Sequence, residues 1–536
     1  MTSRAVVIGL DGAAWHLIDP LIAGGAMPNL AALKARGASG VLLSTVPTYT
    51  PPAWTSAITG VNPGRHGIYG FFEGNAQSSR QELVHAGKVR APTLWEMANA
   101  QGATVGMYNL PLSYPPQKLD GWMISGMMTP ERGEHRLKGF AYPAEVEDEV
   151  LGLEPDYVVD VSADWEADYK SAALCERMLR SLKQRHRVLE MLLETRPVDV
   201  VFAVLEAPDR LQHVYYRYMD PSDPMFESPQ GEEIRPALTE CFAAMDRITG
   251  LLAEHAGDGN VMVCSDHGFT AWEVSVHTNA LLERWGYLRI KPTARALQTR
   301  MARSLVPVAR RILPHRVARR AKGRTFAAID WERTRAFASP IPQQGIFVNL
   351  EGREPHGIVK PGDLEAIKQE IKQRFLDLEG PDGRPVTDRV YLSQDVFSGT
   401  ELDGAPDVLP VLRDHRYELD DEIFHRRPFT DLTHLPRGVH HPDGIVVVAG
   451  RGAAARTGLS ASVLDVTPTL LYQAGLKVPD GLDGKVMNDA FEEGYRRDHP
   501  VATTAPLSSG SRDETSPYSE EEEAAIEESL RGLGYL

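Results

Sequence analysis

The 536-residue chain contains few cysteines, and they are far apart in the sequence. Cys175, Cys241 and Cys264 form no CxxC pair, which excludes a disulfide framework and a thiolate metal site. Every apolar run is shorter than the roughly 20 residues that a membrane-spanning helix needs. The first residues carry one arginine and no small-residue cleavage site, so we expect no signal peptide and a reducing, cytoplasmic location.

The chain also lacks an excess of positive charge. Its formal net charge of −16 at pH 7 argues against a general nucleic-acid-binding protein. The hydrophobic fraction of 42% is ordinary for a globular protein, so a sizeable core can form. An acidic protein that acts on an anionic substrate needs a local source of positive charge, and bound metal ions are one such source.

Acidic and imidazole side chains follow two apolar segments that are typical of buried strands. The segment 5–10 ends in Asp11, and the segment 261–264 is followed by Asp266 and His267. The carboxyl ends of parallel strands face the crevice in which open α/β sheets bind ligands. A carboxylate beside an imidazole suits a divalent ion such as Zn²⁺. A capping aspartate and a surface histidine explain the second pair equally well.

A glycine-rich turn after a first strand is typical of dinucleotide-binding folds, and this chain has Gly9-Leu10-Asp11-Gly12 at that position. This segment lacks the GxGxxG spacing, and it places a carboxylate where a pyrophosphate would have to approach. We therefore disfavour a dinucleotide-binding fold.

Thr50 precedes two prolines, and Gly60 follows ten residues later. Prolines suit the first turn of a helix, so the sequence predicts a helix over 53–58 that Gly60 ends. Thr50 would lie at the helix N-terminus, where free N–H groups favour a phosphoryl oxyanion. A threonine hydroxyl is a poor nucleophile unless a base or a metal activates it. Taken alone, an ordinary capping threonine is the simpler interpretation.

Two more groups of candidate ligands lie downstream. The apolar segment 200–205 leads into Asp209 and His213, and their spacing of four residues puts both on one face of a helix. His440 and His441 precede the apolar segment 445–448. Because neighbouring side chains in an extended backbone point in opposite directions, we expect one of these two imidazoles to reach a metal.

These motifs together resemble the alkaline phosphatase superfamily, and in particular its type I phosphodiesterase/nucleotide pyrophosphatase branch and the bacterial phosphohydrolases and phosphomutases near it. The resemblance runs from residue 6 to about residue 490, and its motifs occur in the same order. It rests on Asp11-Gly12, Thr50 within Pro-Thr-x-Thr-x-Pro, Thr59-Gly60, Pro63-x-x-His66-Gly67-Ile68, Asp209 with His213, Asp266-His267-Gly268, Gly438 to Gly444, and Asp465-Val-Thr-Pro468 with Gly481 to Gly484.

The resemblance implies an α/β fold, namely a three-layer sandwich with a mostly parallel central sheet, helices on both faces and a helical insertion. We expect a catalytic domain over 1–500 with a basic helical insertion or cap over 275–335. Residues 501–518 are low in hydrophobic residues and predict a flexible linker. A capping box at Ser519 predicts an acidic helix over 519–536, which needs docking on this protein or on a partner because it is short.

The resemblance also implies a two-metal phosphohydrolase that cleaves a phosphodiester or pyrophosphate bond through a phospho-threonine intermediate on Thr50. By the same resemblance, the ions are Zn²⁺, with Mn²⁺ as an alternative. The implied ligands of one ion are Asp209, His213 and His440, and those of the other are Asp11, Asp266, His267 and the Thr50 oxygen.

One departure from the family concerns the phosphoryl group. In an ungapped reading from Thr50, the family's asparagine, which donates to a phosphoryl oxygen, would fall at Phe71. The third oxyanion donor is therefore in doubt unless the helix N-terminus suffices. Trp54 and Phe71 would form an aromatic wall that stacks a base, although packing in the core explains both residues equally well. No Cys or Ser in a C/S-x-P-x-R context occupies the nucleophile position, which disfavours a sulfatase.

Two other functions stay open: a phosphomonoesterase or phosphomutase on the same metal core, and a non-catalytic, metal-stabilised interaction module. The Arg- and Lys-rich stretch 293–324 predicts either a solvated face of a cap or a surface that contacts membranes or polyanions. The expected partner is a small phosphorylated substrate rather than a specific nucleic acid. The sequence identifies neither that substrate nor the oligomeric state.

Overall fold

The computed structural model describes residues 3–73, 82–130, 139–292, 328–339, 345–508, 510, 512–533 and 535. The chain divides into two compact units. The first consists of Met1–Ile68, Val84–Ala271 and Pro436–Tyr535, and the second of Tyr69–Leu83 and Trp272–Leu435. The basic stretch 293–324 lies outside the described residues, so the insertion and the surface contacts expected there stay predictions.

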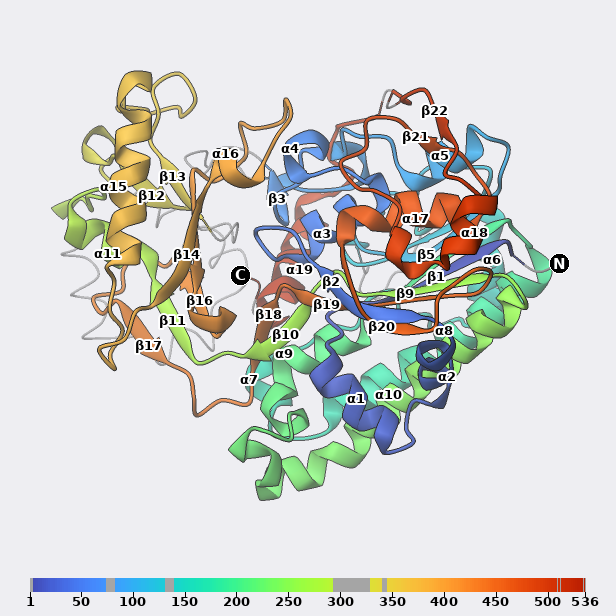
Figure 1. Ribbon diagram of the computed structural model, residues 1–536. Coiled ribbons are helices and arrows are strands. Elements are labelled where there is room, and N and C mark those ends of the chain that lie inside the picture. The colour runs from blue at the N-terminus through green and yellow to red at the C-terminus, as the bar shows by residue number, and fades with distance from the viewer. Residues whose placement is uncertain are drawn as a thin grey trace. The chain divides into compact units, whose positions relative to one another are not determined.

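A nine-stranded sheet forms the centre of the first unit, in the order β20-β2-β19-β9-β1-β8-β5-β6-β7 (Figure 1). Neighbours are parallel from β9 through β1, β8 and β5 to β6, whereas β19 and β7 are antiparallel to their neighbours. The predicted α/β fold with a mostly parallel sheet is therefore confirmed. The strands are β1 (Ala5–Leu10), β2 (Ala38–Leu43), β5 (Val105–Leu110), β6 (Gly121–Ser125), β7 (Ala141–Tyr142), β8 (Val200–Leu205), β9 (Asn260–Cys264), β19 (Asp443–Ala449) and β20 (Arg456–Ser462).

Helices cover both faces of this sheet (Figure 1). The long amphipathic helix α8 (Ala173–Thr195) lies on one face together with α10 (Pro229–Ala256). On the other face, Trp54 of α3 packs with Val7 and Phe202 of the strands in one apolar core. That face also carries α5 (Leu94–Asn99) and α17 (Val466–Gln473), and α3 spans Thr50–Thr59. The remaining helices of the unit include α1 (Trp15–Ala23), α2 (Pro28–Arg36), α4 (Pro63–His66), α6 (Ala144–Leu153), α7 (Trp165–Asp168), α9 (Ala207–Met219) and α18 (Glu493–Asp498).

The described part of the second unit contains three smaller sheets, in the orders β12-β13-β15-β14 and β16-β11-β17 and the pair β3 (Phe72–Glu73) with β4 (Glu82–Leu83). Phe337 and Phe375 belong to its apolar core. The strands are β11 (Val274–His277), β12 (Ala336–Ala338), β13 (Ile346–Val348), β14 (Thr387–Leu392), β15 (Val408–Leu412), β16 (Tyr417–Asp420) and β17 (Phe429–Asp431), with α11 (Thr278–Trp285) and α15 (Leu364–Leu376) as helices.

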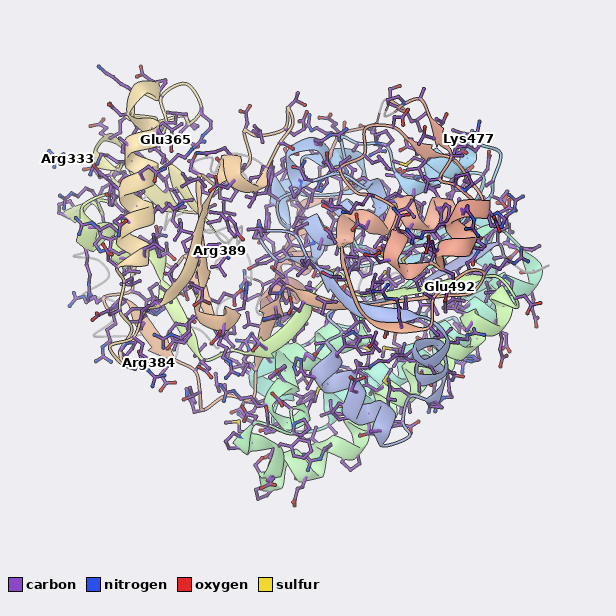
Figure 2. The ribbon with its side chains drawn as sticks, in the orientation of Figure 1. Arg333, Glu365, Arg384, Arg389, Lys477 and Glu492 are labelled. Atoms are coloured by element: carbon purple, nitrogen blue, oxygen red, sulfur yellow. The ribbon has the colours of Figure 1, made fainter. Side chains whose placement is uncertain are left out.

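Charged side chains on both units lie on the surface, as six examples in Figure 2 show. These are Arg333, Glu365, Arg384, Arg389, Lys477 and Glu492, and all six are exposed. Among the described helices, we find none with the length and apolar character needed to cross a bilayer.

The described residues from 501 to 535 belong to the first unit and pack on the rest of it. β22 (Thr503–Thr504) pairs with β21 (Val478–Pro479). The Ser519 N–H donates to the Glu522 carboxylate at 2.8 Å and the Glu522 N–H donates to the Ser519 hydroxyl at 3.3 Å, so the expected capping box forms. It opens α19 (Glu520–Leu533), whose apolar side is buried. The acidic helix therefore docks on this chain. The buried apolar residues are Ile526, Leu530 and Leu533.

Candidate active site

The strands β9, β1 and β8 are neighbours, and because they are parallel their carboxyl ends lie at the same edge of the sheet. Asp11 directly follows β1, and Asp266 and His267 follow β9. β8 leads into α9, whose first two turns carry Asp209 and His213. Three segments that are remote in the sequence thus bring their candidate ligands to one place.

His440 arrives from a separate small sheet, in which β10 (Gly268–Ala271) pairs with β18 (Gly438–His441) in antiparallel fashion. The His440 side chain is buried and faces the other candidate ligands. The His441 ring is partly exposed, and its Nδ1 accepts a hydrogen bond from the Asp443 N–H. The alternation along the strand therefore directs one imidazole of the pair into the cluster.

Asp209, His213 and His440 form a first group of candidate ligands. The Asp209 Oδ1 lies 3.3 Å from the His213 Nε2 and 3.4 Å from the His440 Nε2, and the two Nε2 atoms lie 3.1 Å apart. Tetrahedral coordination with bonds of about 2.0–2.1 Å places ligand atoms about 3.3 Å apart, so this triangle fits a zinc ion. The His440 Nδ1 donates to the carbonyl of Thr48 at 3.0 Å, which leaves its Nε2 lone pair for a ligand.

A second group surrounds the Nε2 of His267. This atom lies 3.2 Å from the Asp266 Oδ2, 3.7 Å from the Asp11 Oδ1 and 3.2 Å from the Thr50 Oγ1. The His267 Nδ1 contacts the carbonyl of Gly268 at 3.1 Å and must donate to it, so the Nε2 accepts and the Thr50 hydroxyl donates. Asp209 also lies within reach of Asp11 and His267, and its carboxylate therefore lies between the two groups.

Three buried carboxylates make this region strongly negative. Burial, followed by the charges of neighbouring carboxylates, raises the pKa of Asp11 and of Asp266 well above the ordinary value. Burial alone would raise the pKa of Asp209 as well, but contacts with His213, His440 and Arg210 hold it well below the ordinary value. Arg210 is shared with a fourth carboxylate, since it pairs with both Asp209 and Asp160.

The donor set of both groups fits divalent metal ions. Within the described part of the chain, the Oδ1 of Asp11 and the Oδ2 of Asp266 are buried and accept no hydrogen bond. Burial lowers the pKa of His213 to about 4 and the pKa of His267 well below its ordinary value, so both rings are neutral as metal ligands must be. Buried charges of one sign need a counter-charge, and two dications between these side chains would supply it.

Thr50 begins α3 and is buried. Its hydroxyl contacts side chains, namely the His267 imidazole and the Tyr535 phenol, and it makes no capping hydrogen bond within the described helix. Pro51 and Pro52 lack N–H groups, and the Ala53 N–H already donates to the Tyr49 carbonyl. The expected binding of phosphoryl oxygens by a free helix N-terminus is therefore reduced to the single N–H of Thr50.

Gly12 links the first two strand ends. Its N–H donates to the Asp266 Oδ1 at 3.2 Å, and its φ of +70° lies in the left-handed region. A Cβ at this position would lie 2.6 Å from the Phe269 ring. The turn that aims Asp11 at its neighbours therefore requires glycine.

The two aromatic residues considered as a wall for a base lie in different units. The Trp54 indole N–H donates to the Asp11 Oδ2 at 3.0 Å, and its ring packs edge-on against Phe202 in the core. Its exposed fraction is 1%, so the Trp54 ring has no free face for a base, and the residue supports a metal ligand instead. Phe71 is buried and belongs to the second unit.

Sequence reasoning missed two residues of this site. The Arg210 guanidinium donates to the Asp209 Oδ2 at 2.7 Å. The Tyr535 hydroxyl lies 2.9 and 3.0 Å from the two Asp209 oxygens and 3.4 Å from the Thr50 Oγ1. Arg210 directly follows the motif residue Asp209, so its position in the sequence could have indicated a role near the site. For Tyr535 the sequence indicated that its helix docks, but not on which surface.

Comparison with known proteins assigns this chain to a family. The family model of type I phosphodiesterase/nucleotide pyrophosphatase matches residues 5–443. Phosphonoacetate hydrolase from Sinorhizobium meliloti, in complex with phosphonoformate, is similar in structure with a TM-score of 0.53 and 18% identity, over 88% of this chain and 95% of that chain. An inactive threonine-to-alanine variant of murine ectonucleotide pyrophosphatase/phosphodiesterase 5, in complex with AMP, has a TM-score of 0.50 and 12% identity, over 91% and 100%. At such identities the two structures show a shared fold.

Proposed function

Because this chain belongs to the type I phosphodiesterase/nucleotide pyrophosphatase family and is a hydrolase of phosphoric ester bonds, we propose that it cleaves a phosphodiester or pyrophosphate bond, with two divalent metal ions and Thr50 as the nucleophile. The observation that carries this proposal is the position of the Thr50 hydroxyl. It lies 3.2 Å from His267, within a cluster of buried carboxylates and imidazoles.

The proposed ligands divide between the two groups described above. Asp209, His213 and His440 would hold one ion, and Asp11, Asp266, His267 and the Thr50 oxygen would hold the other. We propose Zn²⁺, with Mn²⁺ as the alternative, because imidazole and carboxylate ligands suit both. When bound, such ions stabilise a deprotonated hydroxyl and take up negative charge on phosphoryl and leaving-group oxygens.

In the proposed reaction the Thr50 Oγ1 attacks phosphorus, and the bond from phosphorus to the leaving oxygen breaks. The leaving oxygen takes up the Thr50 proton, and the product is a phospho-threonine that still carries the other substituent of the substrate's phosphorus. Water then hydrolyses this intermediate and restores the hydroxyl. The chain supplies the orientation for this step. The proline-shaped start of α3 fixes Thr50, while the Trp54 and Gly12 N–H groups hold Asp11 and Asp266. Burial of the cluster keeps bulk water away from the phosphoryl group.

Ester preference can be tested directly on protein dialysed against Zn²⁺ or Mn²⁺. Turnover of bis-p-nitrophenyl phosphate and of the p-nitrophenyl ester of thymidine monophosphate should exceed that of p-nitrophenyl phosphate. A clear preference for p-nitrophenyl phosphate would replace the diesterase proposal by the phosphomonoesterase alternative. Hydrolysis of none of the three, with either metal, would contradict the proposed function.

A further inference from the structure

The hydroxyl of Tyr535 lies at the centre of the candidate site, beside the nucleophile. It contacts both oxygens of Asp209 at 2.9 and 3.0 Å, and it lies 3.4 Å from the Thr50 Oγ1. Its ring packs against the His213 ring with centroids 4.8 Å apart. The residue is buried, with 4% of its surface exposed. None of the motifs that define the family resemblance includes it.

The fold holds Tyr535 in this position through the helix that precedes it. The apolar side of α19 is buried against the first unit, where its contacts include α9, the helix that carries Asp209 and His213. Near its end, the Leu533 carbonyl accepts a hydrogen bond from Arg437 at 3.4 Å. Gly532 packs so closely that a Cβ there would lie 1.9 Å from the Ala163 carbonyl oxygen. Tyr535 is thus part of a packed surface.

Within the described residues, the start of α3 offers few hydrogen-bond donors to a phosphoryl group. The family's donor asparagine falls at Phe71, which belongs to the second unit. The first turn of α3 contributes the Thr50 N–H alone, because two prolines follow and the Ala53 N–H is already used. A phenol O–H beside the nucleophile is a donor of the kind that stabilises developing negative charge.

We propose that Tyr535 is a catalytic residue whose hydroxyl donates a hydrogen bond to a non-bridging oxygen of the phosphoryl group as Thr50 attacks it. This inference rests on the proposed function. In the structure the Tyr535 hydroxyl donates to the Asp209 carboxylate. With that carboxylate engaged as a metal ligand, the Tyr535 O–H would be available to the phosphoryl oxygen. The hydroxyl is already close enough to the Thr50 Oγ1 to reach an oxygen on the attacked phosphorus.

Tyr535→Phe tests this assignment, because it removes the hydroxyl and keeps the ring. Tyr518→Phe is a matched control in the same segment. It removes a buried hydroxyl that donates to the Met128 carbonyl at 3.0 Å and takes no part in the site. Both variants and the wild type, loaded with Zn²⁺, would be assayed with bis-p-nitrophenyl phosphate. Calorimetric titration with orthovanadate gives a readout that is independent of turnover, because vanadium becomes pentacoordinate when a nucleophile binds it and then resembles the transition state.

We expect Tyr535→Phe to lower kcat by about 10- to 100-fold, somewhat less than the loss of a main oxyanion donor, and to weaken vanadate binding by a similar factor. Its zinc content should equal that of the wild type. Tyr518→Phe should lower the melting temperature and leave kcat and vanadate affinity within twofold of the wild type. These results together would establish that the Tyr535 hydroxyl acts as a hydrogen-bond donor. They would also exclude an effect on activity through loosening of the docked helix.

Two results would overturn the inference while leaving the proposed function intact. Wild-type kcat and vanadate affinity in Tyr535→Phe would show that the hydroxyl takes no part in the reaction. Faster turnover in Tyr535→Phe would show that the hydroxyl obstructs the nucleophile. A wild-type protein that hydrolyses no ester and binds no vanadate would instead refute the proposed function, and the role of Tyr535 with it.

Discussion

The hydroxyl of Thr50 donates a hydrogen bond to the Nε2 of His267 at 3.2 Å, although 217 positions separate the two residues. The contact joins the start of α3 to the residues after β9. It also distinguishes Thr50 from a capping threonine, whose oxygen would accept a hydrogen bond from a backbone N–H. The hydroxyl is therefore directed at the candidate ligands rather than at its own helix.

Thr50→Ala should remove most activity and keep the fold. Turnover should fall by several orders of magnitude, because the covalent nucleophile is lost, while the carboxylate and imidazole ligands remain. Thr50→Ser should keep much more activity, since a primary hydroxyl can attack from the same position. Turnover and melting temperature would be measured on both variants. A folded Thr50→Ala enzyme with nearly wild-type turnover would leave water as the attacking group and remove the phospho-threonine.

Asp209→Asn should lower the content of bound metal more than any substitution at a ligand that belongs to one group, because the Asp209 carboxylate lies between both. Asp160→Asn is the control, since Asp160 pairs with the same Arg210 but lies outside both groups. Metal content after dialysis would be measured by mass spectrometry. Full occupancy in Asp209→Asn would contradict the assignment of the ligands.

Trp54→Phe should weaken metal binding by about tenfold, because loss of an outer hydrogen bond to a ligand typically costs 10- to 100-fold in affinity. The ring remains in the core, but the Asp11 Oδ2 loses its donor. Trp122→Phe is a matched control, because its indole N–H donates to the Arg196 carbonyl at 3.0 Å, away from the ligands. Titration with a chelator would give both affinities, and equal values in the two variants would argue against support of Asp11 by Trp54.

Acid should destabilise the metal-free protein through His66. This ring is fully buried, contacts the Ser56 hydroxyl at 2.9 Å and accepts the Ile68 N–H, and burial lowers its pKa to about 3. The unfolded chain, with a pKa near 6.5, takes up the proton first. The contribution of His66 to stability is therefore complete above pH 6.5 and decreases as the pH falls toward 3.

Urea unfolding of wild type and His66→Asn in a chelator would measure this effect between pH 7.5 and 4. The unfolding free energy of the wild type minus that of His66→Asn should decrease as the pH falls, by at most about 1.4 kcal/mol per pH unit. A difference that stays constant with pH would show that His66 does not account for the acid sensitivity.

The sequence predicted well the strands and candidate ligands that can be located from the pattern of residues close together in the chain. The strands at 5–10 and 200–205 are continuous apolar runs, and each is followed by a candidate ligand, so both could be located without a structure. The fold class followed from the family resemblance, because periodicity alone does not give the order of strands in a sheet. The metal identity, the phosphorylated substrate and the cytoplasmic location stay predictions.

The features that the sequence did not predict depend on contacts between distant residues. The second unit joins 69–83 with 272–435, whereas the sequence indicated an insertion over 275–335 only, because the Arg- and Lys-rich stretch marks one part of this unit and not its full extent. The place of Tyr535 depends on Gly532 against Ala163 and on Arg437 at the Leu533 carbonyl. The surfaces that meet at these contacts exist only once the chain has folded. An amphipathic pattern therefore predicts that a helix docks, but it does not predict on which surface.

The discontinuity of the first unit bears on how the protein is made. Its last stretch, Pro436–Tyr535, supplies His440, and the contact between Thr50 and Tyr535 spans 485 positions. A nascent chain on the ribosome therefore carries its nucleophile early but lacks one imidazole of the cluster until translation has passed both insertions of the second unit. Until then Asp209 and His213 lack the third candidate ligand of their group. The metal ion proposed for this group would therefore be captured only after His440 has been made, and chains that stall before residue 440 are released without a complete first group of candidate ligands.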